Sequence, residues 1–373
     1  MLLTETNLPL IVREIQSLQP DADEAILLLF AEDDVPDIPL LIQLLNAENI
    51  SFFGGVFPGL LYGNQHIKKG CIVKKIKSRM QPFLVTQIAS QQLIGLPERS
   101  NIQIPEHSAA IVLFDGLAPN LNDFLGKLNN AFGGNCDFIG GGAGSLTLQK
   151  TRCIFSSEGL VDDAAVVCVL NKKVRLGFRH GWEHLAGPLV ATQTKKNILV
   201  QLNWQKAFDV YRDIVEKESG EQLTPDNFGA ISFKYPFGIL REKEEDIVRD
   251  PVAILERGAI LCIGEIPTNA VLYIMKSTPE GLLEAVRKAV HDCMFAADNT
   301  PILVESTFVV DCISRTRFLA EYFEKEMSIV REGLTITNPE QEPYGVLGLG
   351  ELASYGENLV ESYNKTIVIG AFH

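Results

Sequence analysis

Two Gly-Glu pairs and one acid–thiol–arginine cluster carry the side chains best suited to chemistry. Glu265 and Glu351 each follow a glycine between apolar stretches. Paired carboxylates serve acid–base work or bind a ligand amine, and the alternative is that they only stabilise turns. Asp311, Cys312 and Arg315 lie where an apolar strand gives way to a helix, which is where layered α/β proteins bind ligands. Arg315 suits a bidentate contact to a carboxylate. Cys312 is a nucleophile, a pocket-lining thiol or a buried one.

The densest glycine stretch is GGGAGS at 140–145. It fits neither the phosphate-binding loop GxxxxGK[ST] nor the dinucleotide fingerprint GxGxxG. Two interpretations stay open, a turn that requires positive φ and a backbone-lined wall of a ligand site. The candidate ligand-binding residues in this and neighbouring segments are Gly141, Gly142, Gly144, Asp115 and Asn364.

His180 and His184 lie in the segment HGWEH. A four-residue spacing brings two imidazoles together only on a helix, and here the preceding segment resembles a strand. The remaining alternatives are ordinary hydrogen-bonded histidines or an axial haem ligand. No cysteine–histidine cluster has zinc spacing, and nothing in the sequence assembles nucleophile, base and orienting group. We therefore expect no enzyme activity. In the alternative that the protein is an enzyme, Cys312 or the carboxylates would carry the reaction.

The elements that position these residues show a repeated pattern. An apolar stretch runs into glycine, and a second apolar stretch follows, in four places: 52–63, 137–145, 261–269 and 345–356. Such repetition indicates a duplicated scaffold, and glycines at strand ends permit tight turns or close approach of a ligand. We expect these turns to line a cleft.

Apolar periodicity predicts strand–helix–strand–turn–strand units over 23–76 and 108–170. The segment STFVVDCISR at 306–315 is the counterpart of AAIVLFDG at 109–116. Helices are also expected at 280–296 and 316–331. Hairpins, one of them at 259–275, predict an α+β fold with mixed or antiparallel layered sheets and helices on one face.

A helix is expected after the strand at 197–202, with one apolar stripe and a C-terminal Gly220. The stripe consists of Trp204, Phe208, Tyr211 and Val215. The charged run REKEEDIVRD at 241–250 is interpreted as a solvated connection. The predicted division is an N-terminal extension at 1–22, a first domain at 23–220 and a ligand-binding second domain at 221–373.

Composition excludes several classes of function. The formal net charge of −14 and pI near 5.0 argue against nucleic-acid binding. No apolar stretch approaches the length of a membrane span, and the first residues lack the features of a signal peptide. Seven cysteines without a CxxC pair are typical of a reducing compartment. We therefore expect a cytoplasmic protein without membrane insertion.

The order of these segments resembles the FIST family of sensory proteins, over roughly residues 23–370. The first half is similar through DEAILLLFA, FFGGVFPG, DFIGGGAGS and HLAGPLVATQTKKNILVQLNWQKAFDVY. The second half is similar through GAILCIGEIP, DCISR, GVLGLGE and YNKTIVIG. His184 in HLAGP departs from the polar or proline-containing residues common there in the family.

The resemblance implies a sensory domain that binds a small molecule, with amino acids as the usual ligand class, and reports to a separate signalling partner. In that hypothesis Arg315 holds the ligand carboxylate, and Glu351 or Asp311 holds its ammonium group. The alternative implied by the family is a haem-based nitric-oxide sensor acting on a histidine kinase or a cyclic-di-nucleotide enzyme. His180 or His184 would then be the haem ligand.

Overall fold

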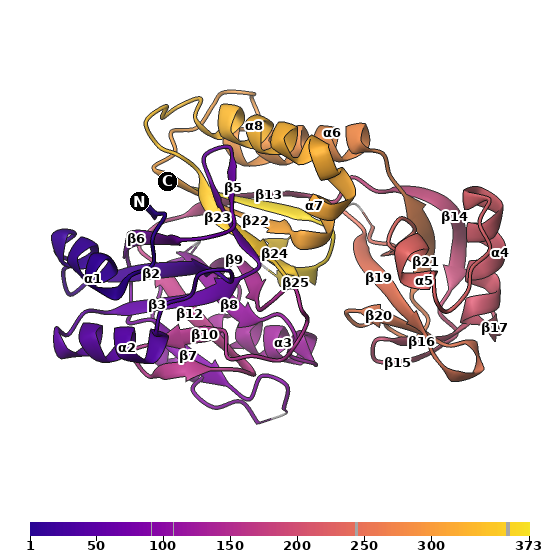
Figure 1. Cartoon of the computed structure of the whole chain (residues 1–373), viewed down its shortest axis with the longest axis horizontal. Helices are drawn as coiled ribbons and strands as arrows, with labels where there is room; N and C mark the ends of the chain where they lie inside the picture. Colours follow the sequence, from indigo (N-terminus) through magenta and orange to yellow (C-terminus); the bar gives the residue numbers. More distant parts are fainter. Residues whose placement is uncertain (91, 107, 243–244, 356–358) are drawn as a thin grey trace.

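The computed structural model describes residues 1–90, 92–106, 108–242, 245–355 and 359–373. Gly356, the last residue of the fourth glycine segment, lies outside the described residues. The molecule consists of a large body and a smaller lobe, at the left and right of Figure 1. The body contains three six-stranded sheets, and the lobe contains the fourth sheet.

Three copies of one unit build the body. In each copy the first strand pairs in parallel with the strand that follows its helix, and antiparallel with the last strand of the unit. The first unit contains β2 (Glu24–Ala31), α2 (Ile38–Ala47), β3 (Phe52–Phe57), β4 (Gly59–Tyr62), β5 (Gln65–Ile67) and β6 (Cys71–Lys77). The second contains β8 (Ser108–Asp115), α3 (Leu121–Phe132), β9 (Cys136–Ala143), β10 (Ile154–Ser156), β11 (Gly159–Val161) and β12 (Ala164–Leu170). The third contains β22 (Ser306–Cys312), α7 (Ile313–Leu319), α8 (Phe323–Leu334), β23 (Tyr344–Gly348), β24 (Glu351–Tyr355), β25 (Leu359–Tyr363) and β26 (Ile367–Phe372).

The units exchange hairpins in a closed ring. The hairpin β10–β11 extends the sheet of the first unit, β24–β25 extends that of the second, and β4–β5 extends that of the third. Each sheet also gains one edge strand beside the last strand of its unit. These edge strands are β1 (Leu2–Leu3), β7 (Phe83–Thr86) and β13 (Val174–Arg179). The three sheets therefore share one strand order, and segments from both halves of the sequence build the same body.

The inner faces of the three sheets meet in a common apolar core, and the helices cover the outer faces. Helices α1 (Leu8–Ser17) and α2 pack on the first sheet, and α3 packs on the second. Helices α6 (Pro279–Met294) and α8 pack on the third. The predicted α+β class with helices on one face of each sheet is confirmed.

A glycine occupies the same place in each unit for a steric reason. A Cβ atom at Gly54, Gly140 or Gly345 would lie 2.0, 1.8 or 1.8 Å from a carbonyl oxygen of the parallel neighbour, which at Gly140 belongs to Val112. No side chain fits at such a distance. The dense glycines of 140–142 thus lie inside β9, where two strands approach closely, and not in a turn.

The lobe is an insertion between β13 and α6. Its elements are β14 (Glu183–Val190), β15 (Gln193–Lys195), β16 (Ile198–Leu202), β17 (Gln205–Lys206), α4 (Ala207–Ser219), α5 (Phe228–Ser232), β18 (Phe237–Ile239), β19 (Ile247–Ile254), β20 (Ile260–Ile263) and β21 (Val271–Lys276). The chain crosses from body to lobe after β13 and returns after β21 (Figure 1). Two crossings join the parts.

Several sequence expectations are wrong in detail. Strands β20 and β21 form no hairpin, because β20 pairs with β19 and β16 while β21 pairs with β14 and β18. Trp204 precedes α4 and is 77% exposed, so the apolar stripe does not include it. The helix expected at 316–331 is interrupted at Ala320, which has a φ of 48°.

The charged run at 241–250 is not a solvated connection. Its second half enters β19, where Arg249 and Asp250 are only 2% and 7% exposed. Both side chains are buried because partners from the body meet them, as shown below. Within the described ranges, no helix is long and apolar enough to cross a membrane.

Candidate functional site

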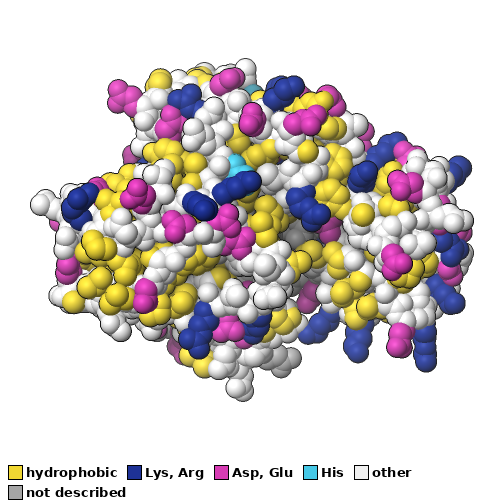
Figure 2. Space-filling view, in the orientation of Figure 1, with side chains coloured by type: hydrophobic (Ala, Val, Ile, Leu, Met, Phe, Trp, Pro, Cys, Tyr) yellow, Lys and Arg dark blue, Asp and Glu magenta, His cyan; other side chains and the backbone are white. Residues whose placement is uncertain are grey.

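A cavity of about 330 Å³ lies between the body and the lobe. The surface is hollowed along the boundary between these two parts in Figure 2. The body contributes the loop after β8, the first turn of α3, the turn before β24 and the end of β25 with Asn364. The lobe contributes residues 196–197, Val252 of β19, and residues 261–265 in β20 and the turn after it. We call this space the inter-lobe cavity.

Among the described residues that line the inter-lobe cavity, two carry charge, Lys196 and Glu265. Both come from the lobe and contact asparagines of the body. The Lys196 ammonium contacts Asn120 Oδ1, and Asn122 Nδ2 donates to Glu265 Oε2 at 3.4 Å. The rest of the lining combines amide and hydroxyl groups with apolar walls from residues such as Leu261. The described lining therefore offers one cation and one anion.

Arg249 braces the floor of the cavity from within the lobe. Its Nε donates to the carbonyl of Glu265 at 3.0 Å, and its Nη1 donates to Ser362 O and Asn364 Oδ1, each at 3.3 Å. Burial lowers the pKa of Arg249. Since Ser362 and Asn364 belong to the body, this guanidinium fixes residues from both sides of the cavity.

Two of the four glycine segments meet at the inter-lobe cavity. Gly264 and Gly350 line it, and so do two predicted ligand-binding residues, Glu265 and Asn364. Gly142 supports the lining indirectly, because its amide donates to the carbonyl of Gly350 at 2.9 Å.

Asp115 shapes the loop that lines the body side of the cavity. Its carboxylate is buried and accepts hydrogen bonds from the amides of Leu117 at 3.0 Å and Asp163 at 2.8 Å. Gly141 instead faces the core beside Val310. The Gly144 amide donates to the carbonyl of Val56 at 2.9 Å, at a separate depression of the body.

Arg315 does not line the inter-lobe cavity, and burial shields its guanidinium from a ligand carboxylate. It is completely buried, with its Nε 3.1 Å from Asp311 Oδ1 and its Nη2 against Glu326 Oε1. Its Nη1 donates to the carbonyl of His180 at 2.7 Å. Arg315 lies in the interior because Asp311 and Glu326 are both buried there, and two desolvated carboxylates require a cation between them. Burial, with Glu326 as the next cause, raises the pKa of Asp311 well above its ordinary value.

Glu351 and Cys312 lie in the same buried region. The Thr366 amide donates to Glu351 Oε2 at 3.2 Å, and burial raises the pKa of Glu351 to about 8. The Cys312 sulfur lies 3.1 Å from Ser314 Oγ, and burial raises the pKa of the thiol far above its usual range. A thiol that stays protonated is a weak nucleophile. Glu265 lines the cavity whereas Glu351 faces the body interior, so the two glutamates do not act as a pair at one site.

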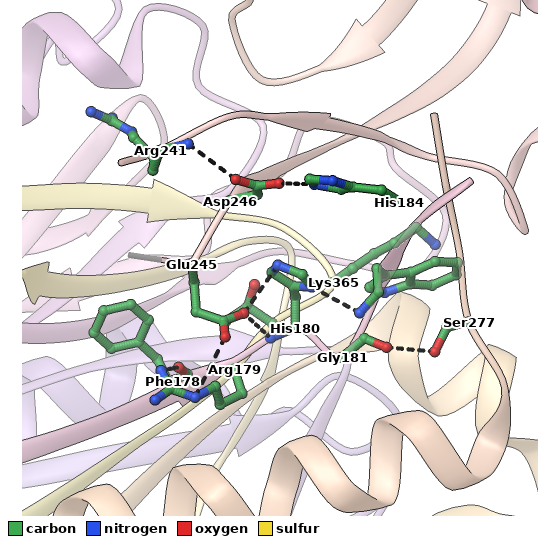
Figure 3. A network of polar contacts seen from close by, with 12 residues as sticks. Phe178, Arg179, His180, Gly181, His184, Arg241, Glu245, Asp246, Ser277 and Lys365 are labelled. Carbon is green, nitrogen blue, oxygen red and sulfur yellow. Dashed lines mark hydrogen bonds and ion pairs between the residues drawn. The ribbon is translucent and has the colours of Figure 1, made fainter. Parts of the chain in front are cut away.

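Lys365 connects the body to the lobe. Its ammonium lies 3.1 Å from Asp250 Oδ1 and donates to the carbonyl of Phe233 at 3.0 Å, both in the lobe. It also lies 4.1 Å from the ring centroid of Phe233 and 4.9 Å from that of Trp182, which is the geometry of cation–π contacts. In Figure 3 this lysine lies beside the first chain crossing. At the same place Ser277 Oγ of the second crossing donates to Gly181 O at 2.6 Å.

The two candidate haem ligands are engaged in hydrogen bonds (Figure 3). His180 accepts from the Trp182 amide through Nδ1 at 2.8 Å, and its Nε2 lies 3.0 Å from Glu245 Oε2. His184 Nε2 lies 2.6 Å from Asp246 Oδ2, and its ring stacks on Tyr273.

These histidines do not fit a haem. Iron could bind His180 only after one of two short contacts had broken. The His184 ring is 41% exposed on a strand of the lobe and is covered by Tyr273 rather than facing an apolar pocket. Within the described ranges, no group of three or more His, Cys, Asp or Glu residues is placed to hold a metal ion.

Sequence reasoning missed Asn120, Asn122, Lys196 and Ser362 of the lining. The two asparagines follow the carboxyl end of β8, which is the edge where a parallel strand pair presents ligand-binding loops. That signal was present in the sequence. Lys196 carried no local signal, since it reaches the cavity only through the packing of lobe on body.

Comparison with protein families matches two domains in tandem. Residues 25–205 match the FIST N domain and residues 207–354 match the FIST C domain. A search of curated proteins gave no match. FIST domains are associated with sensory roles in signal transduction. With both domains present in order over most of its length, the chain belongs to the FIST family.

Proposed function

We propose that this protein is a non-catalytic sensor that binds a small zwitterion, an amino acid, in the inter-lobe cavity and reports its presence to a separate protein. The observation that carries the proposal is the charge pattern of the described lining, in which Lys196 and Glu265 are the charged side chains. A volume of about 330 Å³ is at the small end of ligand sites and suits a ligand of amino-acid size.

The lining matches the three parts of an amino acid. Lys196 would receive the carboxylate, and the first turn of α3 beside it favours negative charge because its amide dipoles point toward the N-terminus. Glu265 would receive the ammonium group. The apolar wall that includes Leu261 and Val252 would cover the side chain. Lys196 and Glu265 now contact asparagines of the body, and on binding they would contact the ligand instead.

The architecture supports a mechanical output. The cavity has walls on both parts of the molecule, and two crossings fastened by Lys365 and Ser277 join those parts. A ligand that contacts both walls favours one orientation of the lobe, because only differential contacts shift a conformational equilibrium. The orientation of the lobe is then the signal read by a partner, for which a histidine kinase or a cyclic-di-nucleotide enzyme is the candidate class. We place this exchange in the cytoplasm.

A thermal-shift screen with the twenty amino acids tests the proposal. A ligand at a hundredfold excess over its Kd should stabilise the protein by about 2.7 kcal/mol. Glu265→Gln and Lys196→Gln should abolish that shift, because each removes the partner of one ligand charge. The matched controls Glu340→Gln and Lys288→Gln change exposed charges outside the cavity and should retain it. A panel without any shift, or a shift that survives both cavity variants, would contradict the proposal.

A further inference from the structure

We propose a second binding site on the body, a pocket of about 580 Å³ that takes a small phosphate-bearing anion. The pocket lies where the last strands of all three units end, and its lining includes Lys74–Lys77 of β6, Leu170–Lys172 after β12 and Phe372–His373 after β26. In Figure 1 both chain termini lie near this region, beside β6. We call it the strand-end pocket.

Lys74 lies on the face of β6 that otherwise packs into the common core. Its neighbours two residues away on β6, Ile72 and Ile76, both belong to the common core, so the Lys74 side chain leaves the same face of the strand. The registers of the other two units place Cys168 and Gly370 at the equivalent position. A lysine therefore points inward where the sister strands carry small, uncharged residues.

The ammonium of Lys74 has no hydrogen-bond or ion-pair partner among the described residues. It lies 5.1 Å from the ring centroid of Tyr344, a fully buried core side chain. Burial, together with the nearby Lys172, lowers the pKa of Lys74. An amine that is drawn out of water without a counter-charge is costly, and a bound anion would remove that cost.

The surroundings are positive in an otherwise acidic protein of net charge −14. The described residues that line the pocket include four lysines and two glutamates. The pair Lys75–Glu24 is 3.0 Å apart and the pair Lys172–Glu305 is 2.6 Å apart, and neither Lys74 nor Lys77 has an ion-pair partner among the described residues. Several cations around one pocket favour a multiply charged anion, and oligophosphates or phosphate esters have that chemistry.

Polar neutral groups complete the site. Asn171, Ser306 and Gln341 line the pocket and supply amide and hydroxyl donors beside the lysines. Lysines rather than aromatic side chains dominate the described lining, since Tyr344 and Phe372 are buried and His373 is the one exposed ring among the described lining residues. The anionic group, rather than an attached base, is therefore the part of the ligand that the pocket recognises.

Isothermal titration with inorganic pyrophosphate tests the proposal on the full chain. Lys74→Met should weaken binding about tenfold or more, as expected for loss of a hydrogen bond to a charged group. Lys288→Met removes an equal charge from the exposed face of α6 and should leave affinity within about twofold, as an exposed charge far from the ligand is screened by salt. If Lys74→Met does not fold, Lys172→Gln decides instead, with a loss of about threefold or more, because one lysine of the cluster is then uncharged.

A parallel sedimentation assay with phosphatidic-acid vesicles distinguishes a free phosphate compound from a lipid headgroup as the source of the anion. Binding of either probe that Lys74→Met weakens about tenfold or more and Lys288→Met preserves supports the site. No binding of either probe at low salt, or equal losses in the two variants, would overturn it.

Discussion

Replacement of Arg315 by methionine tests whether this arginine is structural. The substitution keeps most of the side-chain volume and removes the guanidinium that contacts Asp311 and Glu326. All three side chains are completely buried. Removing one partner of such a cluster leaves uncompensated buried charge and costs about 3–5 kcal/mol. Arg331→Met is the matched control, because Arg331 pairs with Glu342 at 2.7 Å on the surface, where a pair contributes at most about 1 kcal/mol.

The destabilisation caused by Arg315→Met should be larger at high pH than at low pH. The folded-state pKa of Asp311 is already raised by burial, and loss of the arginine removes a neighbour that lowers it. A carboxyl group whose pKa is raised on folding favours the folded state at low pH and loses that contribution as pH rises through the folded value. Arg315→Met should therefore recover stability between pH 8 and pH 5.

Urea unfolding of wild type and both variants at pH 5 and pH 8 measures these differences. The expected result is a large destabilisation of Arg315→Met at pH 8, a smaller one at pH 5, and a small effect of Arg331→Met at both. A cost for Arg315→Met below about 1 kcal/mol at pH 8, comparable with the surface control, would refute the assignment of Arg315 to the interior cluster.

Three further predictions concern the interior. Glu351→Gln should flatten the pH dependence of unfolding between pH 5 and pH 9, because the wild-type pKa of about 8 makes folded stability fall over that range by at most about 1.4 kcal/mol per pH unit; an unchanged profile would show that Glu351 does not titrate there. Gly140→Ala should destabilise by about 3 kcal/mol or more, since its Cβ would meet a carbonyl oxygen at 1.8 Å, whereas Gly126→Ala in α3 meets nothing within 4 Å and should stabilise by about 0.5–1 kcal/mol. Urea unfolding of the pair checks this, and equal effects would contradict it. Lys365→Met should increase amide exchange at the two chain crossings, because Asp250 and Phe233 lose their contact with the body; unchanged protection would argue against a fastening role.

Much of the body could be predicted from the sequence because its signals are local. Buried strands such as β2 and β8 are continuous apolar runs, and their helices show clear periodicity. The repeated glycines indicated duplication, yet their steric cause required the strand pairing. The exchange of hairpins was beyond reach, since β24 and β25 are continuous in sequence with β23 but pair with another unit. Register between distant strands has no local signal.

The candidate site divides in the same way. Glu265 and Asn364 were identified from their segments, while Arg315 was misplaced because its partner Glu326 arrives from the next helix. The residue type alone does not distinguish a cation that is available to a ligand from one that is paired with carboxylates of the same chain. The sequence predicted a solvated segment around Arg249 because its partners, Ser362 and Asn364, come from a distant part of the chain in the body.

Filling the inter-lobe cavity tests the central claim most directly. Val252 lines the cavity and is 39% exposed, so Val252→Trp should fold and occupy the space. Val35→Trp, at a site 40% exposed before α2, is the matched control. Titration calorimetry with the amino acid that stabilises the wild type should show binding to Val35→Trp and none to Val252→Trp. Undiminished affinity in Val252→Trp would contradict ligand binding between the body and the lobe.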